Sequence, residues 1–141
     1  MAYRVLHAAD ANWKESTMLG VLNTDLAAQL GAEGMTARLW RVAPGQMQTR
    51  HRHRKEEELY VLLEGVGRIR VDGDLLTLTP LSAVLVPPES VRQVFNDSDG
   101  DALWLMVGSQ REFGSARDMS EEDIRFMYPD GPYALPPELE S

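Results

Sequence analysis

The chain has 141 residues, no cysteine, and a net charge of −8 from 14 basic and 22 acidic side chains. Its length predicts a single domain, residues 1–141, the missing cysteines exclude disulfides, thiolate metal sites and cysteine nucleophiles, and the charge disfavours nucleic acid and anionic lipid as partners. Since no apolar run approaches the ~20 residues of a membrane span and the N-terminus lacks the layout of a signal peptide, we expect a cytoplasmic protein with no membrane partner.

Short apolar segments separated by turn residues run through most of the chain. Many short strands at this spacing are typical of an antiparallel sandwich or barrel, so the expected fold class is all-β. In chain order, we expect a strand over residues 3–7, a helix over 25–30, strands over 35–42, 58–64, 66–71, 75–79, 83–86, 91–96 and 102–107, and a helix over 121–127.

Cap and turn residues support several of these boundaries. Asn23 or Thr24 is placed to cap the first helix, and Gly31 is a typical stop for it. Asp72-Gly73 is a tight hairpin signal between two of the strands. These local signals agree with the alternation of apolar and polar side chains.

The C-terminal segment has a different composition. Ser120 followed by three acidic residues predicts the start of the second helix. We expect the tail beyond it to pack as an irregular arm or to cross to a partner subunit. Regular structure there is prevented by four prolines, Pro129, Pro132, Pro136 and Pro137.

Two of the three histidines, His51 and His53, form the segment with the clearest chemistry. Alternate side chains of an extended segment share a face, so both imidazoles project to one side. Three candidate carboxylates follow, Glu56, Glu57 and Glu58, and strand parity favours Glu58 over Glu57. Two imidazoles and one carboxylate that converge are the outline of a metal site.

The pattern Gly45-x5-His51-x-His53-x4-Glu58-x6-Gly65 resembles the first motif of the cupin family at every fixed position. Several identities and spacings are met together within this one segment, which makes the match specific. The resemblance covers roughly residues 35–107, the core motif region, and leaves both ends of the chain outside it.

A second, looser resemblance lies downstream. Pro87 and Asn96 occupy positions of the second cupin motif, but Glu89 stands where the family has glycine. Arg92 stands where the family has the histidine that serves as the fourth ligand. A guanidinium has no lone pair to donate and keeps its proton in proteins, so Arg92 cannot be a ligand.

The resemblance implies a small antiparallel jelly-roll barrel with short helices near the two termini, and a homodimer. It also implies a divalent metal inside the barrel, held by three histidines and one glutamate. Carried over to this chain, the ligands are His51, His53 and Glu58, and the cofactor is one divalent transition metal: Fe, Mn, Ni, Co or Zn.

Three interpretations of Arg92 remain open from the sequence. Beside a bound metal, Arg92 either clamps a substrate carboxylate with a bidentate guanidinium or turns outward and leaves the metal to three ligands. In the third interpretation, Arg92 pairs with Glu58 and the site is free of metal. Tyr60, which shares the parity of Glu58, and Gln48, near the rim, are the other candidates for substrate binding.

The leading functional hypothesis is a metal-dependent enzyme that acts on a small anionic organic molecule. Oxygenation at Fe(II) and metal-assisted isomerisation or hydrolysis both fit three ligands with open coordination positions. The competing hypothesis is a non-catalytic cupin that binds or senses a small anion, with or without metal.

Overall fold

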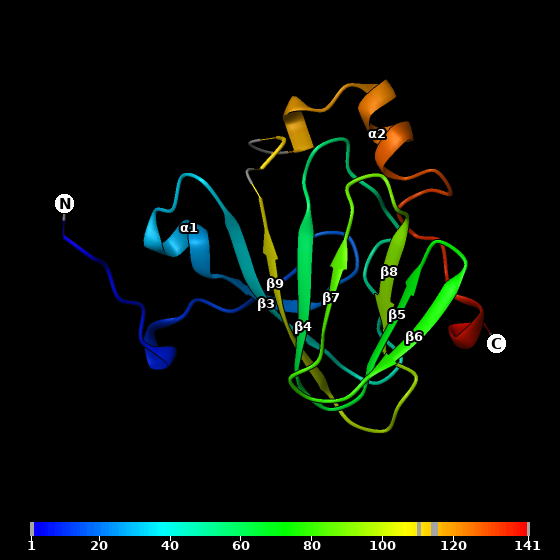
Figure 1. Ribbon diagram of the computed structural model, residues 1–141, viewed down its shortest axis with the longest axis horizontal. Coiled ribbons are helices and arrows are strands. Elements are labelled where there is room, and N and C mark those ends of the chain that lie inside the picture. The colour runs from blue at the N-terminus through cyan, green and yellow to red at the C-terminus, as the bar shows by residue number, and fades with distance from the viewer. Residues whose placement is uncertain (1, 110, 114–115, 141) are drawn as a thin grey trace.

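Two antiparallel β-sheets form the body of the protein in the computed structural model, which describes residues 2–109, 111–113 and 116–140 (Figure 1). One sheet has six strands in the order β1-β2-β3-β9-β4-β7, and the other has three in the order β6-β5-β8. In chain order the elements are η1 (Ala8–Asp10), β1 (Lys14–Glu15), β2 (Leu22–Asp25), α1 (Leu26–Leu30), β3 (Thr36–Val42), β4 (Glu58–Glu64), β5 (Gly67–Val71), β6 (Asp74–Leu78), β7 (Ala83–Val86), β8 (Arg92–Phe95), β9 (Ala102–Gly108), η2 (Ala116–Asp118), α2 (Glu121–Met127) and η3 (Pro137–Leu139).

The core lies between the two sheets because each strand buries alternate side chains. β4 and β9 contribute Tyr60, Leu62 and Trp104 to one buried cluster, and β5 and β8 contribute Ile69 and Val94 to the same cluster. Burial of these apolar side chains is the main force that holds the sheets together.

The expected all-β jelly-roll architecture is confirmed, and most boundaries agree with the sequence. Strands β4 and β7 and helix α2 have the expected ends. Strands β3, β5, β6, β8 and β9 differ from expectation by one residue at one or both ends.

The expected strand over residues 3–7 is wrong. Tyr3 is 89% exposed and Val5 is 62% exposed, and no described strand pairs with this segment, which extends away from the sheets (Figure 1). The N-terminal strands are instead β1 and β2. Asn23 and Thr24 in β2 are buried polar residues, so its sequence lacks the apolar signal by which strands are recognised.

The cap of helix α1 also differs from expectation. Asp25, not Asn23 or Thr24, is the N-cap, and its carboxylate accepts a hydrogen bond of 2.9 Å from the backbone N–H of Ala28. Gly31 ends the helix in the left-handed conformation, with φ of 71°, as expected.

The two glycines of the histidine motif have conformational roles. Gly45 and Gly65 both have positive φ, 82° and 84°. At Gly65 a Cβ atom would lie 2.3 Å from the carbonyl oxygen of Asp101, so a larger residue would disturb the turn after β4.

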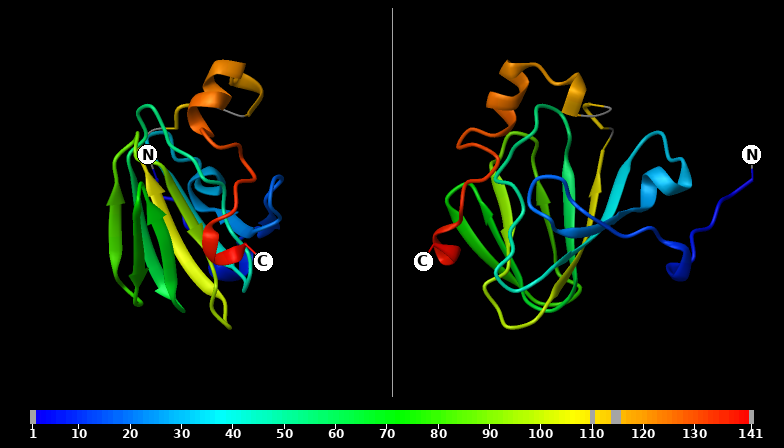
Figure 2. Two further views of the ribbon diagram at one scale, coloured as in Figure 1. Left: turned by 90° about the vertical axis from the view of Figure 1, so that its right-hand side faces the viewer. Right: turned by 180° about the vertical axis from the view of Figure 1, so that it is seen from behind.

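The C-terminal arm packs against its own domain, beside the three-stranded sheet (Figure 2). Arg50 Nη2 donates to the carbonyl of Leu135 at 2.9 Å, and Gln93 Nε2 donates to the carbonyl of Ala134 at 2.8 Å. Of the two expected arrangements, the irregular arm is therefore the one observed. None of the helices within the described residues combines the length and apolar composition that crossing a bilayer requires.

Candidate metal centre and ligand cavity

Backbone pairing fixes the segment that carries the two histidines. His51 forms a bridge with Arg92, in which each backbone N–H donates to the other residue's carbonyl, at 3.0 and 2.8 Å. The N–H of His53 donates to the carbonyl of Pro88 at 2.7 Å. Directly opposed residues of an antiparallel pair point to the same face. The side chain of Arg92 therefore lies beside that of His51.

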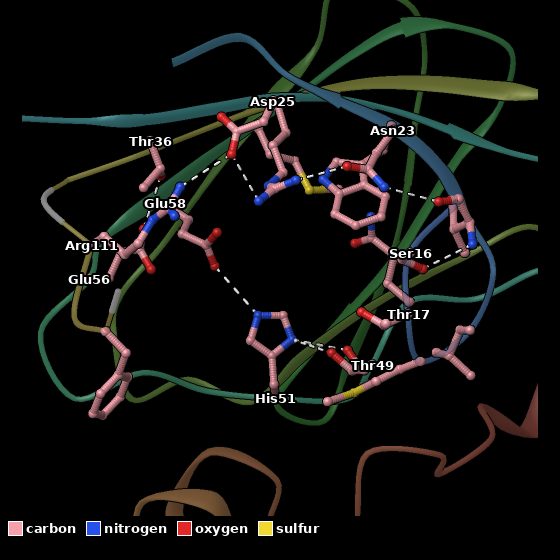
Figure 3. Close-up of a pocket in the computed structure, with 18 of the residues that line it drawn as sticks. Ser16, Thr17, Asn23, Asp25, Thr36, Thr49, His51, Glu56, Glu58 and Arg111 are labelled. Atoms are coloured by element: carbon pink, nitrogen blue, oxygen red, sulfur yellow. Dashed lines mark hydrogen bonds and ion pairs between the residues drawn. The ribbon is translucent and has the colours of Figure 1, made fainter. Parts of the chain in front are cut away.

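The three expected ligands converge on one point, and Figure 3 shows two of them, His51 and Glu58, facing the same cavity. Glu58 Oε1 lies 3.6 Å from His51 Nε2 and 3.2 Å from His53 Nε2. One atom from each residue lies within 4.8 Å of the other two. Ligands that each sit about 2.1 Å from one ion have comparable separations. The three side chains are therefore spaced for a single metal ion.

The second nitrogen of each imidazole, Nδ1, faces a polar group. His51 Nδ1 lies 3.0 Å from the carbonyl oxygen of Thr49, which accepts hydrogen bonds only, so Nδ1 carries the proton. His53 Nδ1 lies 3.5 Å from Glu56 Oε2. In both rings the other nitrogen, Nε2, faces Glu58, so it is the atom through which each histidine could bind a metal.

Glu56 is a buried residue beside His53 whose place in the site the sequence did not reveal. It is only 7% exposed, and one carboxylate oxygen accepts a hydrogen bond of 3.0 Å from the Thr36 hydroxyl. A Cβ atom at Gly108 would lie 2.5 Å from this carboxylate, so the glycine leaves room for it. Burial, with a further contribution from the Glu58 charge, raises the pKa of Glu56. The available sequence signal was the position of Glu56 two residues before Glu58, which places both side chains on the same face of an extended segment.

The substitution Glu56→Gln is expected to weaken metal binding by about 10–100-fold, because His53 loses the carboxylate that orients it. Titration with Co(II), followed by visible absorption, would measure the affinity. Glu57→Gln is the matched control, since Glu57 is exposed. Equal affinities of the two variants would contradict the orienting role.

Four groups surround a single oxygen of Glu58. Besides the two histidines, the Tyr60 hydroxyl donates to Oε1 at 3.0 Å, and Arg92 Nε lies 3.4 Å away. Burial alone would raise the pKa of Glu58, but hydrogen bonds and charge from His51 and His53 outweigh it and hold the pKa far below the usual range. Burial and the neighbouring Glu58 raise the pKa of Tyr60. Glu58 is therefore ionised and Tyr60 protonated at neutral pH.

The guanidinium of Arg92 is fully buried, so the interpretation in which it turns outward is wrong. Its Nη1 donates to the carbonyls of Pro88 and Ser90 at 2.9 and 2.7 Å, and Nη2 donates to that of Pro87 at 3.4 Å. The side chain therefore donates hydrogen bonds to the backbone of the turn after β7. To clamp a substrate carboxylate, it would have to leave these carbonyls.

The convergent side chains line a cavity of about 680 Å³. Tyr60 and Gln48 also line it, as expected of substrate-binding candidates, whereas Arg92 is not among the described residues on its wall. Gln48 is 8% exposed, and its Nε2 has no hydrogen-bond partner among the described residues. A buried donor without a partner is costly, so a ligand oxygen would satisfy it.

Helix α2 holds the histidine segment from outside. Arg52 and Arg54 alternate with the histidines, and their guanidinium carbons lie 4.0 and 4.1 Å from the centre of the Phe126 ring. Arg52 Nε also donates to the carbonyl of Phe126 at 2.7 Å. Cation–π contacts of this kind fix the segment while the imidazoles face inward.

Removal of this contact is expected to loosen the metal-binding segment. Phe126→Ala should lower the free energy of unfolding by about 1–2 kcal/mol. Thermal denaturation would measure this loss as a lower melting temperature. Ile124→Ala, at a more exposed position of the same helix, is the control. If both variants have the same melting temperature as the parent chain, the helix does not stabilise the segment.

Comparison with known proteins gave a match to one family model. The model of the family described as "Cupin domain" matches residues 38–108. A search of curated proteins found no match to this chain.

Solved structures with the same architecture were also found. A sugar phosphate isomerase from a cupin superfamily, from Silicibacter pomeroyi, is 20% identical, with a TM-score of 0.71 and coverage of 77% of this chain and 76% of that one. TT1209 from Thermus thermophilus is 34% identical, with a TM-score of 0.54 and coverage of 56% and 75%. A predicted oxalate decarboxylase from Thermotoga maritima is 16% identical, with a TM-score of 0.68 and coverage of 77% and 100%.

Proposed function

This chain belongs to the cupin domain family, and from that premise we propose that it is a metal-dependent enzyme acting on a small anionic organic molecule. The observation that carries the proposal is the convergence of His51 Nε2, His53 Nε2 and Glu58 Oε1 on the wall of a cavity large enough for such a molecule. Three protein ligands leave coordination positions for substrate or water.

A divalent transition metal held by His51, His53 and Glu58 would supply Lewis-acid polarisation of a substrate oxygen, or dioxygen chemistry if it were Fe(II). The chain's own groups prepare this site. The Thr49 carbonyl and Glu56 orient the imidazoles, and the Tyr60 hydroxyl positions Glu58. Gln48 Nε2 supplies a hydrogen-bond donor inside the cavity.

The test combines metal analysis with a substrate screen. We expect purified protein to bind one equivalent of Fe, Mn, Ni, Co or Zn per chain and to convert a member of a panel of sugar phosphates and small carboxylates. Product analysis by NMR with and without dioxygen separates oxygenation from isomerisation or hydrolysis. A chain that binds none of the five metals would refute the proposal.

A second candidate function is a metal-free cavity that binds or senses an anion. The buried pair of Arg92 and Glu58, 3.4 Å apart, favours it, because a positive charge beside the carboxylate opposes a dication. In this case phosphate or carboxylate binding would persist in the presence of EDTA, without conversion of any compound.

The homodimer and the cytoplasmic location expected from the sequence stay predictions. An apolar surface suited to a second copy lies on the outer face of the six-stranded sheet, where Leu59 and Leu85 are opposed residues of β4 and β7, 39% and 57% exposed. Leu85→Arg is expected to convert the dimer to a monomer in sedimentation velocity, because it places a charge in the interface. Leu81→Arg, at an exposed turn, is the control; a monomeric parent chain would contradict the prediction.

A further inference from the structure

Two arginines share one carboxylate on the wall of the cavity. Arg38 Nη2 lies 2.9 Å from Asp25 Oδ2, and Arg111 Nη2 donates to the same oxygen at 3.3 Å. The other oxygen of Asp25 already accepts the capping hydrogen bond from Ala28. One negative charge therefore faces two positive charges, and this cluster carries a net charge of about +1.

The strand register explains where this cluster lies. Asp25 and Arg38 are opposed residues of β2 and β3, so their side chains share a face. Arg38 also donates from Nη1 to Asn23 Oδ1 at 2.8 Å, and Asn23 is only 2% exposed. Arg111 follows the end of β9. All four residues line the cavity.

The cluster lies across the cavity from the histidines. Figure 3 shows Asp25 and Asn23 on the side opposite His51, with open space between them. A ligand that spans this space would place one end at the ligand triad and the other at the two guanidinium groups.

The arginines keep hydrogen-bonding capacity for such a ligand. Asp25 is the only partner of Arg111 among the described residues, and it engages one of the five N–H donors of the guanidinium. The nearby carboxylate of Glu112 is engaged elsewhere, since it accepts hydrogen bonds from the backbone N–H groups of Lys55 and Glu56.

We infer that Arg38 and Arg111 form an oxyanion subsite, which binds a phosphate or carboxylate group of the substrate while its other end reaches the metal-binding triad. Guanidinium groups bind both oxyanions through paired, charge-assisted hydrogen bonds. Asp25 holds the two arginines in place when no ligand is bound. The part of the inference that places one end of the ligand at the triad rests on the proposed function. The anion subsite formed by the two arginines does not depend on it.

The test measures anion binding to metal-free protein. Inorganic phosphate and acetate would be titrated into the EDTA-treated chain, with binding followed by isothermal titration calorimetry and by chemical shifts in NMR spectra. Arg38→Gln and Arg111→Gln are each expected to weaken phosphate binding by about tenfold. Asp25→Asn should strengthen it by roughly threefold, because it removes the competing carboxylate and keeps a residue that caps helices well.

Arg41→Gln is the matched control, since Arg41 lies on the same strand but pairs with Glu64 and Asp101 outside the cavity. The gain expected for Asp25→Asn cannot arise from misfolding. Phosphate affinity that is unchanged in all three cavity variants, or a parent chain that binds neither anion, would overturn the inference. Anion binding with the expected variant pattern in a chain that never binds metal would support the subsite and refute the metal proposal.

Discussion

Replacement of His53 by alanine is expected to reduce bound metal from about one equivalent per chain to a trace, with affinity lowered more than about 100-fold. His53 Nε2 is one of three atoms that converge, so two ligands remain without it. The fold should persist, because the backbone N–H of residue 53, which pairs with the Pro88 carbonyl, is unaffected. Metal content after dialysis, measured by plasma mass spectrometry, and the circular dichroism spectrum are the two readouts.

His7→Ala is the control, because His7 lies in the N-terminal segment outside the cavity. A stoichiometric metal that survives His53→Ala would mean that the ion lies elsewhere. Glu56→Gln supplies an intermediate case, since it disturbs the orientation of His53 and leaves all three ligand atoms present. The expected order of affinity is therefore parent chain, Glu56→Gln, His53→Ala.

The convergence of three candidate ligands could be predicted from sequence because its signal is local. His51, His53 and Glu58 lie within one short segment, and strand parity alone directs them to a common face. The strands that form the core were predictable for the same reason, since their alternating apolar residues are a local pattern. Strand β2 was missed because its buried residues, Asn23 and Thr24, are polar and satisfied by tertiary contacts.

The remainder of the cavity depends on pairings between distant segments. Arg38 meets Asp25 through the register of β2 with β3, and Arg111 reaches Asp25 from beyond β9. The sequence likewise shows that Arg92 is no ligand, but not that its terminal nitrogens satisfy carbonyls of the preceding turn. Because the terminal nitrogens of Arg92 are bound to these carbonyls, we propose that Arg38 and Arg111, rather than Arg92, bind the anion.

Arg92→Met is expected to have opposite effects on folding and on metal binding. Loss of the guanidinium removes a hydrogen-bond donor from the carbonyls of Pro88 and Ser90 and the positive charge beside Glu58, so the free energy of unfolding of metal-free protein should fall by about 3 kcal/mol. Metal affinity should rise at least about tenfold, because a buried positive charge beside the ligands is removed. Urea denaturation of EDTA-treated protein and competition with a chromophoric chelator measure the two quantities.

Arg68→Met, on the neighbouring strand β5, is the control for loss of a buried arginine stem. Arg68 pairs with Asp97 at the surface, so we expect Arg68→Met to lower the free energy of unfolding by less than about 1 kcal/mol and to leave metal affinity unchanged.

Arg92→His extends the experiment, because it removes the permanent charge and adds a nitrogen ligand at the position where the sequence resemblance implies one. If Arg92→Met and Arg92→His lose stability and neither binds metal, Arg92 and Glu58 form a structural ion pair, and the cavity functions without a metal. If both variants bind metal more tightly than the parent chain, Arg92 weakens a functional site, and its carbonyl contacts are the reason the chain retains it.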